Sequence, residues 1–359
     1  MVGSCQFLFH KTLKVLKSQF TKKETLMDRI YKVGIIGCGG ISRMHADMYK
    51  AFSRVKMIAS ADINGDNAKK LASEYNIEKT YTDYKEMLEK EKLDIVSICT
   101  WPATHSEITI ESAKRGVKGI LCEKPMGENL AQADAMIQAC EQYGVKLAID
   151  HQLRFAGNYV RAKELIESGA IGEFFRIYAI CGGGDLKDNA THTIDLMRFI
   201  CGDKPIEWVV GQIERVGDIK RYGLDSEQFA LGYMKFSDNV RGIIEVGDDT
   251  ASGYHHIYCY GTEGEIELGV PSGPWIRMRT KATNGDWIIP ETYPDVSPVE
   301  DLVNSIEENR EHRSSGYQGR ATHEVIMAIY ESSRRRKRVR LPLEEKESPL
   351  TLMIKEELL

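Results

Sequence analysis

The sequence predicts an α/β fold in two parts, a doubly wound parallel sheet followed by a largely antiparallel sheet. From about residue 30 to residue 150, apolar strand-like runs alternate with helical segments, which is typical of a parallel sheet covered by helices. Beyond residue 150, strand-like runs follow one another without helices between them, as in antiparallel sheets. The length of 359 residues suits about two domains.

The first part is predicted to begin at Ile30. Its strands are expected at residues 31–36, 55–61, 95–99, 119–122 and 146–149, and its helices at residues 42–51, 67–75, 84–90, 104–115 and 129–143. The strand segments are apolar runs, and the helical segments repeat apolar residues at helical spacing. Because right-handed crossovers join parallel strands, the ligand crevice is expected at the carboxyl ends of these strands.

The second part is predicted to open with a helix at residues 159–168. Strands with period-two character are expected at residues 174–180, 208–215, 229–236, 241–246 and 257–260. Two helices, at residues 298–311 and 320–334, and a short run at 339–341 are expected to close the fold. These elements predict a first domain at residues 27–149, a second domain at residues 150–345, and a tail at residues 346–359.

Residues 1–26 form an N-terminal extension that mixes apolar residues with lysines. Its apolar core is too short and interrupted for a secretory signal. A lysine-rich amphipathic helix could lie on a membrane surface, and an organelle presequence would favour Arg and Ser instead. We favour Met27 as the true start, because the folded pattern begins immediately after it.

The charge balance argues against a dedicated nucleic acid binder. The chain has 48 basic and 53 acidic side chains and a net charge of −5, so no basic excess is present to neutralise phosphates. The basic run at residues 334–338 is explained as a solvated helix end. Because no segment approaches the roughly 18 uninterrupted apolar residues of a spanning helix, we expect no membrane partner.

The eight cysteines are scattered, without a CxxC pair, and several lie within apolar runs. This pattern favours reduced, buried thiols in a cytoplasmic protein. A disulfide framework would be expected in a shorter secreted chain, and a zinc site would have closely paired cysteines. We therefore expect no bound metal.

A glycine-rich turn, residues 37–42, directly follows the first strand and opens a helix, which is the context that makes a GxGxxG-like motif specific. Gly37 allows the tight turn and Gly39 allows a pyrophosphate to approach the backbone. Gly40 and Ile41 lead into the helix, whose N-terminus favours phosphate. Ser42 stands where a small residue is needed for packing, a mild departure. The alternative is a glycine turn without a ligand.

Asp62 ends the second strand, about 20 residues beyond the glycines, where a carboxylate can accept hydrogen bonds from ribose hydroxyls. It would repel a 2′-phosphate, so we expect NAD rather than NADP as the cofactor. The alternative is a turn-forming aspartate at a strand end.

Lys124 follows the strand at residues 119–122 and is expected to project into the crevice. Its ammonium group could hydrogen-bond a substrate hydroxyl and hold developing alkoxide charge. The alternative is an exposed lysine before a turn proline.

Asp188, His192 and Asp195 are spaced to share one face at the start of a helix. His192 could accept a hydroxyl proton, with Asp188 orienting its ring. A divalent metal site is an alternative, although no second histidine or cysteine cluster lies nearby in the sequence. Asp188 could also be only an N-cap, and Asp195 is interpreted as structural.

Five motifs together resemble the glucose-fructose oxidoreductase, inositol dehydrogenase and rhizopine catabolism (Gfo/Idh/MocA) family from Ile30 to about Leu343. They are the glycine motif at residues 33–42, Cys-Glu-Lys-Pro at 122–125, His-Gln-Leu-Arg-Phe at 151–155, Gly-Ala-Ile-Gly-Glu at 169–173, and the segment 188–195. The resemblance implies a Rossmann domain followed by an α/β domain with a large, mainly antiparallel open sheet. It also implies a homodimer or homotetramer.

The resemblance further implies a catalytic set of Lys124, Asp188 and His192 around the nicotinamide. Thr100, Pro102, His105 and Glu123 are expected beside the cofactor with Lys124, whereas Gln152 and Arg154 are expected to line the substrate or nicotinamide pocket. The alternative for Arg154 is a structural ion pair. Two departures from the family pattern occur: Trp101 and Pro102 stand where relatives have Pro and Asn, and Ala190 replaces a frequent glycine.

The leading hypothesis is an NAD-dependent dehydrogenase that acts on a secondary hydroxyl of a sugar, sugar derivative or cyclitol. Redox-assisted elimination or glycoside cleavage with NAD recycled is a second possibility, because its oxidation half would use the same residues. A non-enzymatic NAD- or sugar-binding regulator is the third, and the presence of Lys124, Asp188 and His192 argues against it.

Overall fold

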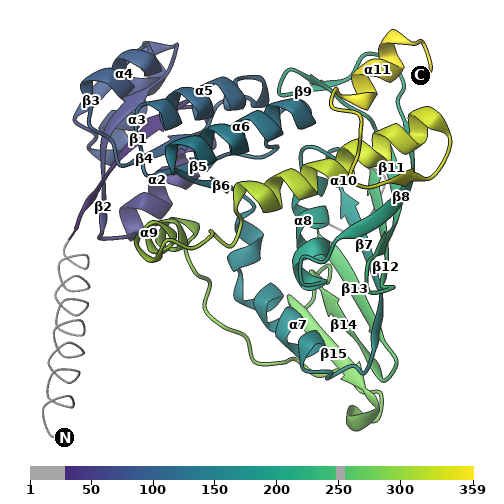
Figure 1. The fold of residues 1–359 in the computed structure, drawn as a ribbon. Coiled ribbons are helices and arrows are strands. Elements are labelled where there is room, and N and C mark those ends of the chain that lie inside the picture. The colour runs from purple at the N-terminus through teal and green to yellow at the C-terminus, as the bar shows by residue number, and fades with distance from the viewer. Residues whose placement is uncertain (1–28, 248–254) are drawn as a thin grey trace, which may run out of the picture.

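The computed structural model describes residues 29–247 and 255–359 and has two sheets joined by helices (Figure 1). The first sheet is parallel, and the second is mixed and mostly antiparallel. The predicted α/β fold class is therefore confirmed. The predicted extension at residues 1–26 and the predicted start at Met27 lie outside the described residues.

The first sheet has the strand order β3-β2-β1-β4-β5-β6, and all its neighbouring strands are parallel. Its described strands are β1 (Tyr31–Ile36), β2 (Val55–Ala61), β3 (Lys79–Tyr81), β4 (Ile95–Ile98), β5 (Gly119–Cys122) and β6 (Lys146–Ile149). The sequence does not predict β3, because its three residues are exposed or half-buried and form no apolar run. Strand order reverses between β1 and β4, which is where such sheets bind their ligands.

Helices connect these strands, and their N-caps explain where they begin. They are α2 (Ser42–Ala51), α3 (Gly65–Tyr75), α4 (Tyr84–Lys90), α5 (Pro102–Lys114) and α6 (Leu130–Tyr143). Helix α3 begins two residues before the predicted start, because the Asn64 side chain accepts a hydrogen bond from the Asp66 N–H. Helix α5 also begins earlier, since Pro102 occupies its first turn, where a missing N–H costs nothing.

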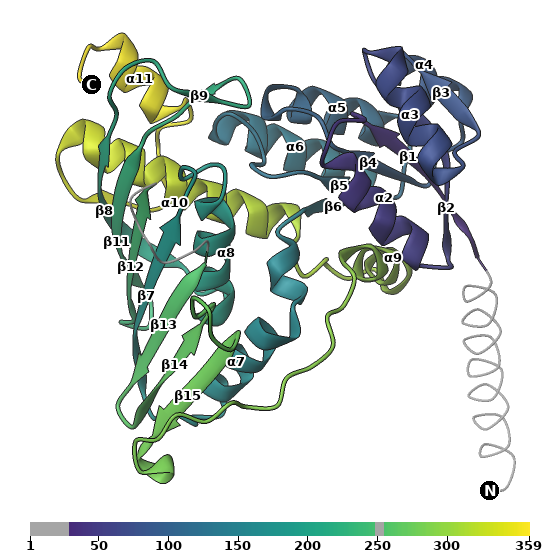
Figure 2. The same cartoon turned by 180° about the vertical axis from the view of Figure 1, so that it is seen from behind.

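One helix from the second half of the chain packs on the first sheet. Helix α9 (Pro298–Glu308) lies against β5 and β6 (Figure 2). A Cβ at Gly119 would lie 2.9 Å from the Ile306 side chain, so glycine allows this close approach. Residues outside the predicted first domain, 27–149, therefore also pack against the first sheet.

The second sheet has the strand order β15-β14-β13-β7-β12-β11-β8-β16. Its described strands are β7 (Phe174–Gly182), β8 (Ile206–Glu214), β11 (Phe229–Phe236), β12 (Arg241–Gly247), β13 (His256–Gly261), β14 (Gly264–Leu268), β15 (Ile276–Thr280) and β16 (Val339–Arg340). Strands β7 and β12 are parallel, and the other neighbours are antiparallel. A separate hairpin contains β9 (Lys220–Arg221) and β10 (Leu224–Asp225).

The expected strands omit β14 and β15, although charged residues alternate with apolar ones in both, which is the period-two pattern of a half-buried strand. Glu265 lies opposite Arg279 and Glu267 lies opposite Arg277, and the side chains of each pair form an ion pair. These cross-strand pairs stabilise the two strands while lowering the apolar content that marks a strand in sequence.

Helices cover one face of the second sheet. They include η1 (Gln152–Phe155), α7 (Gly157–Glu167), α8 (Ala190–Ile200) and α10 (Gly316–Arg335), and η2 (Lys281–Thr283) follows β15. Helix α8 is buried along its whole length. Helix α10 contacts β8 of the second sheet and β6 of the first, so it joins the two layers (Figure 1).

The segment predicted as a tail, residues 346–359, is part of the fold. It contains α11 (Pro349–Lys355), which packs against α10 and buries Leu350 and Met353. Across residues 29–247 and 255–359, no helix has the length and apolar character needed to cross a membrane.

Candidate active site

The glycine turn after β1 has the backbone shape that its motif predicts. Gly37 has a φ of +86°, and an added Cβ would lie 2.7 Å from the Cys99 carbonyl, so only glycine fits. At Gly39 and Gly40 no atom of the described chain lies within 4 Å of an added Cβ. The turn is therefore open on this side, as the approach of a pyrophosphate requires.

Helix α2 starts directly after this turn, with Ile41 as its N-cap. Ser42 is buried, and its hydroxyl donates a hydrogen bond of 2.6 Å to the Gly39 carbonyl. A small residue thus fills the third motif position, and the departure from glycine is accommodated. The free N–H groups of the first turn of α2 and the helix dipole favour an anion beside the glycines.

Asp62 joins the glycine turn to the start of α3. Its carboxylate accepts hydrogen bonds from the Cys38 N–H at 2.7 Å and from the Asn64 N–H at 2.8 Å. The side chain therefore has the turn-forming role considered as an alternative. It also remains partly exposed at the end of β2, so it can accept hydrogen bonds from the ribose hydroxyls of a dinucleotide.

The segment after β4 brings Thr100, Pro102 and His105 to the same edge of the sheet. His105 is buried, and its ring nitrogens lie 3.0 Å from the carbonyl oxygens of Pro125 and Thr100. Burial, only partly offset by these contacts, lowers the pKa of His105. Both nitrogens are thus occupied by backbone, and His105 connects the Thr100 loop to the Lys124–Pro125 loop rather than facing a ligand directly.

Lys124 and Asp188 meet across the interface between the two sheets. The Lys124 ammonium donates to the carbonyl and to the Oδ1 of Asp188, each at 3.0 Å. Both side chains are mostly buried. The ring of Tyr222, from the β9–β10 hairpin, lies 6.0 Å from the Lys124 nitrogen. A cation is therefore fixed at the carboxyl end of β5, close to the switch point of the parallel sheet.

The position of Asp188 differs from the predicted helix face. Helix α8 begins at Ala190, and Asn189 is its N-cap, so Asp188 lies in the turn before the helix. The Asp188 N–H donates to the Asp185 carboxylate at 2.7 Å, which stabilises this turn. The predicted pairing of Asp188 with His192 is replaced by the pairing of Asp188 with Lys124.

His192 lies in the first turn of α8, between two other histidines. Its ring centroid is 5.6 Å from that of His151 and 6.0 Å from that of His255. Burial, and then the charges of His151, Lys124 and His255, hold the pKa of His192 well below its usual value of 6.5. Its Nδ1 has no hydrogen-bond partner among the described residues. His192 is thus a neutral imidazole whose buried Nδ1 is unpaired within the described residues.

Gln152 and Arg154 have different surroundings, although both were expected in the pocket. The Oε1 of Gln152 is buried and has no hydrogen-bond partner in the described part of the chain, so it can accept a bond from a ligand. Arg154 is fully buried, and its guanidinium binds the carboxylates of Asp195 and Asp203. The expectation that Arg154 lines the pocket is therefore corrected, because ion pairs occupy its donors.

The same contacts assign a structural role to Asp195 and remove the metal alternative for segment 188–195. Asp195 accepts from Arg154 and from the Thr322 hydroxyl, while Asp188 pairs with Lys124. The two carboxylates therefore face different cations. A different group among the described residues, His45, Glu123 and Asp150, has ligand atoms within 4.8 Å of one another.

Several residues of the site carry no motif signal. Tyr222 comes from a short hairpin whose two-residue strands leave no periodic pattern, and His255 comes from a segment before β13. The one usable signal belongs to His45. It lies on the buried face of α2 with Ser42, Ala46 and Tyr49, and a histidine at such spacing on an apolar face needs a buried partner.

Comparison with known families matches both parts of the chain. A family model described as "Oxidoreductase family, NAD-binding Rossmann fold" matches residues 31–151. A second model, the "GFO/IDH/MocA C-terminal domain", matches residues 174–267. The two models belong to the same family and match more than half of the chain between them.

Individual proteins with similar sequences or folds agree with this match. The chain is 29% identical over 256 residues to a myo-inositol 2-dehydrogenase from Thermotoga maritima, covering 66% of this chain and 74% of that protein. The structure of the WlbA dehydrogenase from Bordetella pertussis, in complex with NADH and UDP-GlcNAcA, has a TM-score of 0.74 at 22% identity, covering 88% and 100%. Aldose-aldose oxidoreductase from Caulobacter crescentus has a TM-score of 0.76 at 22% identity, covering 87% and 100%. The two structures show that the fold is shared.

Proposed function

The chain belongs to the Gfo/Idh/MocA family of oxidoreductases with an NAD-binding Rossmann fold, and on this premise we propose its reaction. It transfers a hydride between nicotinamide and the secondary hydroxyl or ketone carbon of a sugar, sugar derivative or cyclitol. The observation that carries this proposal is the pairing of Lys124 with Asp188 beside the neutral His192. A fixed cation can stabilise negative charge on the carbinol oxygen, and an uncharged base can accept the proton of its hydroxyl.

The chain's own residues divide the work on the reacting oxygen. Lys124 binds that oxygen and stabilises its developing negative charge, while Asp188 holds the ammonium group in place. His192 accepts the hydroxyl proton at Nδ1, which is buried and has no hydrogen-bond partner among the described residues, and returns it in the reverse reaction. His151 fixes the nearby backbone, because its Nε2 lies 3.0 Å from the hydroxyl of Thr191, the residue before His192.

We propose NAD as the cofactor, with NADP disfavoured. When bound, NAD accepts two electrons and a hydrogen from the substrate carbon. Gly37 makes the tight turn, Gly39 and Gly40 leave the backbone open to the pyrophosphate, and the N-terminus of α2 follows them. Asp62 would accept hydrogen bonds from the ribose and would repel a 2′-phosphate. Thr100, Pro102 and the backbone at Glu123 and Lys124 line the same edge.

The substrate class rests on the relatives and on polar groups in the site. The T. maritima relative is named for a cyclitol substrate. Gln152 offers a buried, unpaired amide oxygen, which suits a neighbouring hydroxyl of a polyol. Pro102, Pro125, Lys187 and Tyr222 are among the residues that line a small cavity beside Asp188.

The proposed function is tested by incubating the protein with NAD and a panel of sugars, sugar acids and cyclitols. NADH absorbance and product mass are followed together. Stoichiometric NADH with a ketone product is the expected result. Product without net NADH would overturn net dehydrogenation and favour elimination or glycoside cleavage with NAD recycled. Saturable NAD and sugar binding without any product would favour a regulator.

We also propose that the chain forms a homodimer or homotetramer through the uncovered face of the second sheet (Figure 2). An apolar stripe crosses five strands there, since the neighbours in register are Val210, Tyr233, Ile243, Tyr178 and Tyr258. Tyr233 and Val210 are more than one-third exposed. Such a stripe is typical of an interface between subunits.

The oligomer proposal is tested by light scattering on Tyr233→Arg, with the exposed Tyr143 of α6 as the matched control position. A dimer or tetramer for the wild type and for Tyr143→Arg, and a smaller species for Tyr233→Arg, is the expected result. A monomeric wild type would contradict it.

We propose a cytoplasmic location as well, which is supported by seven described cysteines that are all buried and free.

A further inference from the structure

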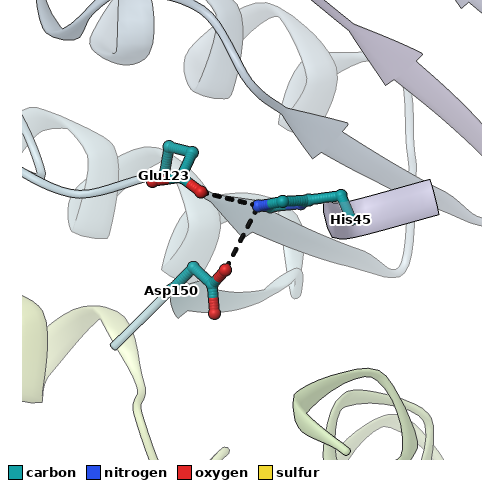
Figure 3. A group of neighbouring side chains, drawn as sticks. All are labelled: His45, Glu123 and Asp150. Carbon is teal, nitrogen blue, oxygen red and sulfur yellow. Dashed lines mark hydrogen bonds and ion pairs between the residues drawn. The ribbon is translucent and has the colours of Figure 1, made fainter. Parts of the chain in front are cut away.

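A buried histidine points one ring nitrogen at two buried carboxylates (Figure 3). The Nε2 of His45 is 2.8 Å from the Oε1 of Glu123 and 3.2 Å from the Oδ2 of Asp150. On its other side, the Nδ1 lies 2.6 Å from the hydroxyl of Ser97. All four side chains are almost completely buried. One imidazole therefore contacts the side chains at the ends of three neighbouring strands.

The three elements that meet here are the ones that carry the proposed chemistry. His45 is in α2, the helix that follows the glycine turn. Glu123 directly follows β5 and precedes Lys124, while Asp150 directly follows β6 and precedes His151. A contact that fixes Glu123 and Asp150 thus acts one residue away from two members of the site.

Charge makes His45 necessary to both carboxylates. Outside its contact with His45, neither oxygen of Asp150 has a hydrogen-bond partner among the described residues. Two buried carboxylates on one side of a ring cost free energy unless a cation lies between them. An imidazolium supplies that cation and can donate from both nitrogens.

Five groups face His45, and the two carboxylates and the Cys99 sulfur among them favour its charged form. They are Glu123 after β5, Asp150 after β6, Ser97 in β4, Cys99 after β4, and Tyr49 one helical turn further along α2. Burial lowers the pKa of His45, but the Cys99 sulfur and the hydrogen bonds to Asp150 and Glu123 together raise it well above 6.5.

The contacts continue from the two carboxylates into the site. The other carboxylate oxygen of Glu123, Oε2, accepts the Lys124 N–H at 3.1 Å. On the second branch, His151 follows Asp150 and hydrogen-bonds Thr191 at the start of α8. The first branch ends at Lys124 and the second ends beside His192.

We propose that His45 is a positioning residue, which binds Glu123 and Asp150 together and so holds Lys124 and His151 where the reaction needs them. The proposal rests on the proposed function for the roles of Lys124 and His192. A divalent metal among the three ligand groups is the competing explanation of the same geometry. The distance of 2.8 Å from Nε2 to the Glu123 oxygen is that of a hydrogen bond, and the distance of 3.2 Å to the Asp150 oxygen is that of an ion pair, so we assign the site to the histidine.

The activity arm compares His45→Gln and Asp150→Asn with Tyr49→Phe. Tyr49 is the matched control, because it is buried on the same face of α2 and its hydroxyl has no hydrogen-bond partner within the described ranges. We expect kcat to fall about 10- to 100-fold in the first two variants, since small displacements of reacting groups cost that much. KM and the Kd for NAD should change by no more than a few-fold. Asp150→Asn is nearly isosteric and carries the test if His45→Gln does not fold.

The second arm needs no substrate. Hydrogen exchange in the peptides spanning residues 119–126 and 146–153 is measured in the cofactor-free protein, and metal content is measured in the same samples. Faster exchange in both peptides of Asp150→Asn and His45→Gln, with Tyr49→Phe unchanged and no stoichiometric metal, is the expected result. Unchanged exchange and kcat, or one divalent metal per chain, would overturn the proposal. If the wild type turns over no substrate, the proposed function fails, while the exchange result still tests His45.

Discussion

Two buried histidines close to Lys124 have opposite charge states. His45 faces the carboxylates of Glu123 and Asp150, and its pKa is raised well above 6.5 despite its burial. His192 faces Lys124 and two other histidines, and burial with these charges lowers its pKa well below 6.5. The same side chain is therefore a fixed cation in one region and a neutral proton acceptor in the other. Burial lowers the pKa of both histidines, and only at His45 do the neighbouring groups overcome it.

Removing His192 is expected to have the largest effect, because His192 is the group proposed to accept the proton of the substrate hydroxyl. His192→Ala should lower kcat by about 10²- to 10⁴-fold, the usual contribution of a positioned general base. Steady-state kinetics with the substrate found in the panel would measure it, and the Kd for NAD would be the control. An unchanged kcat would contradict the contrast between His45 and His192, because His192 would then have no part in proton transfer.

Removing Lys124 tests the cation whose charge helps to lower the pKa of His192. Lys124→Ala should lower kcat by about 10²- to 10³-fold, as the loss of a single donor to a developing oxyanion does. The same change removes a positive charge that lowers the pKa of His192 and of His255, so histidine titration by NMR should move upward. A fall in NAD affinity with kcat retained would instead give Lys124 a binding role.

Much of the fold follows from the sequence, since strands β1, β2, β4, β5 and β6 are continuous apolar runs between helices. Strand β3 does not follow, because its exposed residues form no apolar run, whereas β14 and β15 carry a period-two pattern that is short and low in apolar residues. In the site, Lys124 and His192 could be predicted from their places at a strand end and a helix start. The partner of Asp188 could not, because Lys124 lies 64 residues away in sequence. For Arg154 the sequence offers a structural ion pair only as an alternative, since a charged residue type does not reveal its partners.

A third buried histidine extends the comparison to stability. His323 in α10 faces Lys187 and Arg320, and burial with these charges lowers its pKa to about 3. The unfolded chain therefore binds more protons below pH 6.5, and stability falls as the pH decreases below that value. At pH 5 this one group should cost about 2 kcal/mol relative to pH 7.

His323→Gln removes that titration while keeping a polar side chain of similar size. Urea unfolding at pH 5 and pH 7 should therefore give a smaller loss of stability on acidification than the wild type shows. An equal loss in both proteins would mean that His323 does not stay neutral in the folded chain.

Asp62 is proposed to act on the cofactor's ribose rather than on the reacting oxygen, so its effect on the chemical step should be the smallest. Asp62→Ala should weaken NAD binding about tenfold, or about 1.4 kcal/mol, with kcat little changed. It should also relax the rejection of NADP, since the carboxylate that repels a 2′-phosphate is gone. Titration of both dinucleotides measures the two effects, and unchanged affinities would leave Asp62 only its hydrogen bonds to Cys38 and Asn64.

The central claim is that this site moves a hydride from a carbinol carbon of the substrate to NAD. The most direct measurement uses the substrate identified in the panel, deuterated at its ring carbons, and follows the label by mass spectrometry of the dinucleotide. The account predicts one deuterium in each NADH formed, with slower formation than from the undeuterated substrate. NADH without the label, or product formation with the label released to water, would contradict it.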